Sequence, residues 1–159
     1  RILKSRQAIT KIGIVGALNI SKVKRKVAEH GLSGITDIHP LLPPERLPGF
    51  LTQAKLCLFP SHNDAYGVGV VEAVSCGALV LASDAVGCAP DVLASDQILP
   101  PDTASDWATA CEELLTNPGK WDHIRTTQSA SIAINTADHH ARSIWQAVLA
   151  ARSRSRDTA

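Results

Sequence analysis

The chain has 159 residues, of which 45% are hydrophobic, and these values indicate one globular domain with a substantial core. Its formal net charge of +1 gives no reason to expect a nucleic-acid partner, and no apolar run reaches the length of a transmembrane helix. The four cysteines show neither a C-x-x-C pair nor zinc-ligand spacing, which argues against a zinc domain and favours free thiols in a reducing compartment.

In chain order, short apolar runs typical of strands alternate with segments of helical spacing. We expect strands at residues 11–16, 35–39, 55–61, 78–83 and 97–101. We expect helices at residues 19–32, 43–54, 68–76, 89–95, 103–117 and 137–153. Ser21 is the expected cap of the first helix, Gly77 closes the third, and residues 153–159 form a frayed tail.

The alternation of strands and helices predicts an α/β fold, a doubly wound parallel sheet of the Rossmann-like kind. The apolar run "ALVLAS" at residues 78–83 is typical of a strand that helices cover on both faces. We expect one domain over residues 1–152. Because the chain begins at Arg1 and contains no methionine, we also expect a truncated start within a longer protein.

The stretch "SHNDAYGVGVVEAVSCG" places two acids around a glycine-containing helix start. Asp64 and Glu72 are separated by seven residues, and Gly67 and Gly69 lie between them. A helix start presents unpaired backbone N–H groups and a partial positive charge, so it is a site for an anion such as phosphate. The glycines remove side chains that would block a close approach.

Charge supports backbone amides as the phosphate ligands. No lysine or arginine occurs between Lys55 and Lys120. The flanking carboxylates would accept hydrogen bonds from paired hydroxyls, which a ribose and a sugar both offer. The spacing alone leaves a second interpretation open, in which an ordinary helix carries one acid after an acidic loop.

The run "FPSHNDAYGVGVVEAVSCGALVLASDAVGCAPDVL" closely resembles the donor-binding half of retaining GT-B glycosyltransferases, the family-4 group in particular. It contains "PS" at a strand end, two acids separated by seven residues, "EA", a glycine and an apolar strand in the order typical of that family. The resemblance covers about residues 11–120. It implies the carboxy-terminal half of a GT-B fold.

The resemblance also implies roles for individual residues. Asp64, as the first acid, would contact the donor sugar at the catalytic centre, and Glu72 would bind the ribose hydroxyls. Backbone amides just after Gly67, those of Val68 and Gly69, would hold the diphosphate. The base would lie against the loop that runs from His39 to Leu41.

The function that the resemblance implies is transfer of a sugar, of the hexosyltransferase type, from a nucleotide diphosphate sugar to an acceptor hydroxyl. No metal or other cofactor is expected. An amino-terminal acceptor domain would be missing, so the isolated domain would be inactive. The protein would be cytoplasmic, and any contact with the inner membrane surface would come through the missing domain.

Two alternatives from other classes remain open. A non-catalytic nucleotide-binding or interaction module of the same fold would show low affinity for every nucleotide sugar. A nucleotide-sugar epimerase-like domain would convert or hydrolyse its donor without an acceptor.

Overall fold

The computed structural model describes residues 11–134. Its strands are β1 (Ile12–Ile14), β2 (Thr36–Ile38), β3 (Leu56–Phe59), β4 (Leu79–Ser83) and β5 (Ile98–Leu99). Its α-helices are α2 (Ile20–Glu29), α3 (Leu47–Leu51), α4 (Val68–Ser75), α5 (Ala89–Val92), α6 (Ala104–Thr116) and α7 (Pro118–Ile134). Two short 3-10 turns, η1 (Ser33–Ile35) and η2 (Ser95–Gln97), precede β2 and β5.

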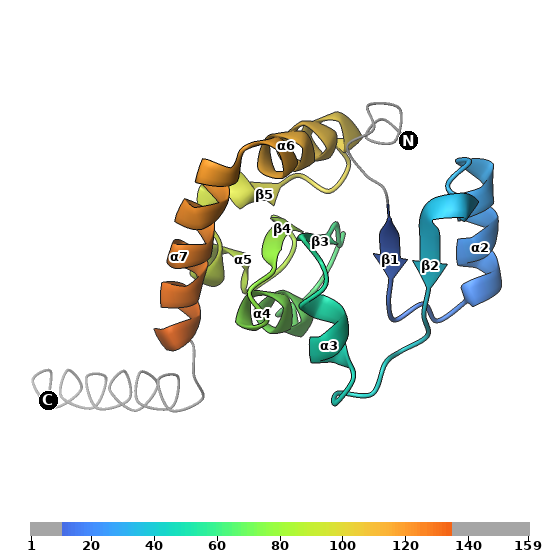
Figure 1. The fold of residues 1–159 in the computed structure, drawn as a ribbon, viewed down its shortest axis with the longest axis horizontal. Coiled ribbons are helices and arrows are strands. Elements are labelled where there is room, and N and C mark those ends of the chain that lie inside the picture. Colours follow the sequence, from blue (N-terminus) through green and yellow to red (C-terminus); the bar gives the residue numbers. More distant parts are fainter. Residues whose placement is uncertain (1–10, 135–159) are drawn as a thin grey trace, which may run out of the picture.

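The ladders among these strands are parallel, which confirms the fold class that the alternation predicts. They form two groups, β1 with β2 and β3 with β4 and β5. In Figure 1, β1 lies between β2 and β3, so the direction in which successive strands are added reverses there. Doubly wound sheets bind ligands at such a reversal, beyond the carboxyl ends of the strands.

β4 is the centre of the core, because all five of its residues are buried. Val80 and Ala82 pack in a cluster with residues of α3, α4 and α5. Leu79 and Leu81 pack in a second cluster with residues of α6 and α7. Successive side chains of a strand point to opposite faces, so helices cover both faces of β4, as the run "ALVLAS" predicts.

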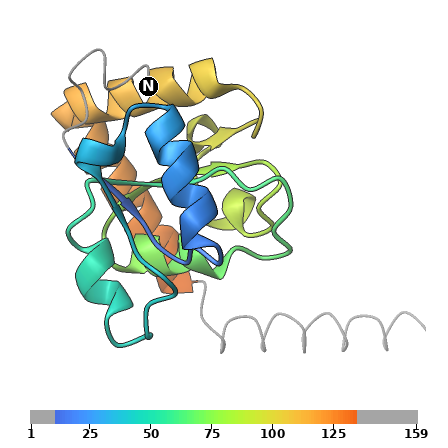
Figure 2. The same ribbon diagram turned by 90° about the vertical axis from the view of Figure 1, so that its right-hand side faces the viewer.

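The first helix packs at one end of the molecule. Figure 2, viewed from that end, shows α2 lying across the outside of the β1–β2 ladder. Its cap is Asn19, whose side chain accepts a hydrogen bond of 2.9 Å from the Lys22 N–H. The expectation that Ser21 caps this helix is therefore wrong, since the asparagine two residues earlier already satisfies a free N–H.

The carboxy-terminal part of the fold contains a helix that the sequence pattern does not predict. α7 follows α6 after a single residue and packs against α4, α5 and β4. One of its buried residues is the polar Gln128, which interrupts the apolar stripe that would otherwise indicate an amphipathic helix in the sequence. The expected helix at 137–153 and the expected tail at 153–159 lie outside the described residues.

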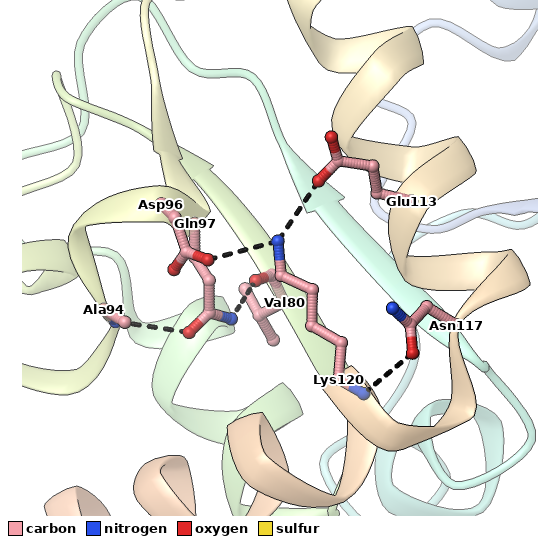
Figure 3. A network of polar contacts seen from close by, with 7 residues as sticks. All are labelled: Val80, Ala94, Asp96, Gln97, Glu113, Asn117 and Lys120. Atoms are coloured by element: carbon pink, nitrogen blue, oxygen red, sulfur yellow. Dashed lines mark hydrogen bonds and ion pairs between the residues drawn. The ribbon is translucent and has the colours of Figure 1, made fainter.

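A network of polar contacts ties the junction between α6 and α7 to β4 (Figure 3). The Lys120 ammonium lies 3.1 Å from a Glu113 oxygen and 3.3 Å from an Asp96 oxygen. Beside it, the buried amide of Gln97 donates a hydrogen bond of 2.7 Å to the Val80 carbonyl. Figure 3 shows both contacts converging on the turn that precedes β5, so side chains hold that turn against the core.

Candidate functional site

Two loops after neighbouring strands form the centre of the candidate site. The β3 loop (residues 61–67) connects β3 to α4, and the β4 loop (residues 84–88) connects β4 to α5. The Ser83 hydroxyl, which is buried, donates a hydrogen bond to the Ser61 carbonyl and joins the starts of the two loops. Both loops follow the carboxyl ends of parallel strands, where ligands bind in this class of sheet.

The helix start at the end of the β3 loop depends on Gly67. Its φ angle is +91°, in the left-handed region, and it is the N-cap of α4. Its carbonyl accepts a hydrogen bond of 2.9 Å from the Val70 N–H. The N–H groups of Val68 and Gly69 occupy the first two helical positions, where a helix supplies no carbonyl partner. Two adjacent backbone donors therefore stand at the positive end of the helix.

Both glycines are required by packing against the protein itself. A Cβ atom at Gly67 would overlap the Cγ1 atom of Val86. A Cβ atom at Gly69 would lie 2.9 Å from a ring carbon of Phe59. The sequence predicts that these glycines allow a ligand to approach, and the structure gives a second reason for them, the close packing of α4 against β3 and the β4 loop.

Asp64 is half-buried and joined to the β4 loop through its backbone. Its N–H donates to the Ala85 carbonyl at 3.1 Å, and its carbonyl accepts from the Gly87 N–H at 3.0 Å. Its Oδ1 atom accepts a hydrogen bond of 3.3 Å from the Tyr66 N–H, which closes a local turn. The carboxylate of Asp64 therefore shapes the β3 loop and keeps its other oxygen for a further partner.

Glu72 is half-buried one helical turn after the N-terminus of α4. Val68, four residues earlier, therefore lies on the same helical face, and its side chain is 60% exposed. The N-terminal end of this face of α4 is therefore open to solvent.

The remaining predicted site residues follow β2. The His39 N–H donates a hydrogen bond of 2.7 Å to the Ile14 carbonyl. The His39 ring contacts the Phe50 ring edge-on, with ring centroids 5.2 Å apart. Leu41 is 79% exposed. This segment thus has a histidine ring packed against Phe50 of α3 and a leucine side chain that is exposed to solvent.

The structure adds two residues that the sequence-based reasoning did not assign, Gly87 and Cys88. The Cys88 thiol donates a hydrogen bond of 3.4 Å to the Gly67 carbonyl, and both groups are buried. A Cβ atom at Gly87 would overlap the Ala65 carbonyl oxygen. In the sequence, the glycine of the "VGC" stretch is the one signal of this close approach between the two loops.

Among residues 11–134, no group of three or more His, Cys, Asp or Glu side chains is placed to hold a metal ion. Over the same residues, no helix combines the length and the apolar character that crossing a bilayer requires.

A family model described as "Glycosyl transferases group 1" matches residues 1–130. The chain belongs to this family. This confirms the resemblance to group 1 glycosyltransferases that the β3 loop and α4 carry in the sequence.

Several group 1 relatives are named D-inositol 3-phosphate glycosyltransferase. The protein of Mycobacteroides abscessus is 36% identical over 92 residues, which cover 54% of this chain and 20% of the relative. The protein of Thermobispora bispora is 27% identical over 125 residues, which cover 77% of this chain and 27% of the relative. The chain therefore spans about a quarter of the length of these relatives.

Solved structures of glycosyltransferases share the fold. Sucrose-phosphate synthase from Thermosynechococcus elongatus superposes with a TM-score of 0.71 at 21% identity, over 94% of this chain and 42% of that protein. The α,α-trehalose 6-phosphate synthase of Burkholderia multivorans also gives a TM-score of 0.71, at 15% identity, over 98% of this chain and 39% of that protein. These matches confirm the Rossmann-like fold of GT-B glycosyltransferases for this chain.

Proposed function

We propose that this chain is the donor-binding domain of a retaining glycosyltransferase. The reaction would transfer a sugar, of the hexosyl type, from a nucleotide diphosphate sugar to an acceptor hydroxyl. The proposal rests on the arrangement of residues at the start of α4, in a chain that belongs to the group 1 glycosyltransferases. There, a left-handed Gly67 presents two backbone N–H groups between two half-buried carboxylates, Asp64 and Glu72.

The diphosphate would bind at the N–H groups of Val68 and Gly69. These donors point out of the first turn, and the helix adds a partial positive charge at the same place. The sequence has no lysine or arginine between Lys55 and Lys120, so the β3 loop, α4 and the β4 loop supply no cationic side chain of either type. Any lysine or arginine that meets the diphosphate would come from elsewhere in the protein.

The two carboxylates would bind different parts of the donor. Glu72 lies one turn inside the helix and would accept hydrogen bonds from the ribose hydroxyls. Asp64 lies before the helix and would contact the sugar. The base would lie against the segment from His39 to Leu41, where the exposed leucine offers an apolar surface. No divalent metal or other cofactor is part of the proposal.

The two carboxylates are tested separately, because their roles predict different losses. Glu72→Gln removes charge-assisted hydrogen bonds to the ribose, each worth about 1.5–3 kcal/mol, so nucleoside diphosphate and nucleotide sugar should both bind roughly tenfold or more weakly. Asp64→Asn should weaken the nucleotide sugar more than the nucleoside diphosphate. The asparagine oxygen can still accept from the Tyr66 N–H, so the β3 loop should keep its shape.

The measurement is calorimetric titration of the full-length protein that carries this chain, with UDP, GDP and ADP and with a nucleotide sugar of whichever base binds. Glu112→Gln is the matched control, since it changes a half-buried helical glutamate in α6. The buried residues Trp107, Cys111 and Leu114 of α6 lie in the core cluster of Leu79 and Leu81, which contains no residue of α4. If Asp64→Asn affects the diphosphate and the nucleotide sugar alike, Asp64 only orders the loop. If Glu72→Gln leaves both ligands unchanged, Glu72 has no part in donor binding.

Residues 1–159 alone should transfer no sugar. Transfer requires donor and acceptor to be held together in one closed site, and in this proposal the acceptor is bound by a separate amino-terminal domain. Assay of the isolated chain with donor and acceptor measures this directly. Robust transfer would show that the proposed division between donor and acceptor domains is wrong.

A further inference from the structure

The β3 loop and the β4 loop are joined backbone to backbone. Two hydrogen bonds link Asp64 to Ala85 and Gly87, and a third, of 2.7 Å, runs from the Cys88 N–H to the Tyr66 carbonyl. Asp64 and Val86 pair as a short parallel bridge. This isolated bridge lies beyond the ends of β3 and β4, so the two loops are joined to each other as well as to their strands.

Cys88 extends this pairing to the helix start itself. Its side chain is fully buried, and its thiol donates to the Gly67 carbonyl at 3.4 Å. That carbonyl and the Val68 N–H belong to the same peptide group. A peptide group is planar and trans, so its C=O and N–H point in opposite directions. A contact that holds the Gly67 carbonyl toward the core therefore also holds the Val68 N–H toward the outside of the helix start.

The protonation state and the packing of this corner agree with a donor role. Burial raises the pKa of the Cys88 thiol, so the sulfur keeps its proton at neutral pH and can donate it. The neighbouring Gly87 leaves no room between the loops, since a Cβ atom there would overlap the Ala65 carbonyl oxygen. The geometry that brings the thiol to the Gly67 carbonyl is thus fixed by backbone packing on the same loop.

We infer that Cys88 is a positioning residue for the donor diphosphate: its thiol holds the Gly67–Val68 peptide so that the Val68 N–H faces the ligand. The inference rests on the proposed function, because the ligand is the diphosphate of that donor. Cys88 itself is buried behind the peptide and touches no ligand. Its effect reaches the diphosphate only through the orientation of one N–H group.

The test compares Cys88→Ala, Cys88→Ser and a matched control, Cys111→Ala. Cys111 is also a buried free cysteine, but it lies in α6 within the other core cluster. Both alanine variants therefore remove a buried thiol, and only one removes the contact with Gly67. The probes are UDP, GDP and ADP, each titrated into the full-length protein by calorimetry, with urea unfolding measured for every variant.

Cys88→Ala should weaken the nucleoside diphosphate that the wild type binds by about two- to tenfold, the range expected for one weak hydrogen bond. Cys88→Ser should recover part of the affinity, because a hydroxyl can donate to the same carbonyl. Cys111→Ala should leave affinity unchanged while losing comparable stability. In the ligand-free protein, hydrogen exchange of the Val70 amide, which donates to the Gly67 carbonyl at 2.9 Å, should be faster in Cys88→Ala than in Cys111→Ala.

Each other result counts against the inference in a distinguishable way. Equal affinity of Cys88→Ala and the wild type overturns the positioning role and leaves the proposed function standing. A Cys88→Ser variant as weak as Cys88→Ala shows that the hydrogen bond is not the cause. If the wild type binds none of the three diphosphates, the proposed function is wrong, and the positioning of a diphosphate by Cys88 is wrong with it.

Discussion

Replacement of Gly67 by alanine should damage the fold more than the same replacement at Gly77. Both glycines have left-handed backbones, with φ angles of +91° and +77°. They differ in the space around the missing Cβ atom. At Gly77 the nearest atom is a terminal nitrogen of Arg125 at 3.5 Å, an ordinary contact with a flexible side chain. At Gly67 the new atom would overlap Val86, which is 1% exposed.

The two variants share one cost and differ by another. Alanine in the left-handed region costs about 1–2 kcal/mol, and the smaller entropy of the unfolded chain offsets about 0.4–1 kcal/mol of it. Gly77→Ala should therefore lose about 1.6 kcal/mol at most. Gly67→Ala adds the cost of forcing a methyl group into a packed core, about 1–3 kcal/mol. The difference between the variants should be about 1–3 kcal/mol.

Equilibrium urea unfolding of both variants and the wild type gives this difference directly. Because the overlap with Val86 also shifts the start of α4, Gly67→Ala should weaken nucleoside diphosphate binding under conditions where it remains folded, and Gly77→Ala should not. If the free energies of unfolding of the two variants agree within about 0.5 kcal/mol, a difference no larger than the usual deviation from additivity of independent mutations, the argument from packing is refuted. The left-handed angle would then explain both losses by itself.

Three further perturbations have defined outcomes. Gln97→Leu should cost about 1–3 kcal/mol in urea unfolding, because the buried Val80 carbonyl loses its donor; no loss would mean that the carbonyl finds another. Burial raises the pKa of Cys111 from 9.0 to about 11, so its stabilising effect is complete below pH 9 and falls as pH rises toward 11. Cys111→Ala should therefore flatten the alkaline loss of stability, and an unchanged pH profile would contradict this. Lys120→Met should cost about 1 kcal/mol or less, since the carboxylate partners of Lys120, Glu113 and Asp96, are more than half exposed, and high salt should reduce the difference from the wild type.

The sequence predicts the centre of this fold because its pattern there is unambiguous. The run "ALVLAS" is typical of a strand covered on both faces, and β4 is buried throughout. The helix start at Gly67 follows from a glycine between a strand and an apolar helical segment. The family resemblance of the same stretch then places the candidate site at that loop.

Other features depend on contacts that no local pattern records. The pairing of Asp64 with Val86 depends on the register of two strands, and the residues are far apart in the chain. The hydrogen bond from Cys88 to Gly67 depends on that pairing in turn. The sequence pattern does not reveal α7, because the buried polar residue Gln128 interrupts its apolar stripe. Spacing along the sequence identifies the candidate ligands, while the contacts that hold them require the folded chain.

The buried amide of Gln97 has a consequence for how β5 finds its place. The ladder between β4 and β5 contains only two residue pairs, Ala82 with Ile98 and Ser83 with Leu99. Because the ladder is so short, a shift of its register by one residue would lose few backbone hydrogen bonds. Such a shift would turn every side chain of β5 to the opposite face. The slide would move Gln97 by about 3.3 Å and leave its amide buried without the Val80 carbonyl. The hydrogen bond from Gln97 to Val80 thus fixes the register of β5, so that a single polar side chain selects one alignment of this edge strand.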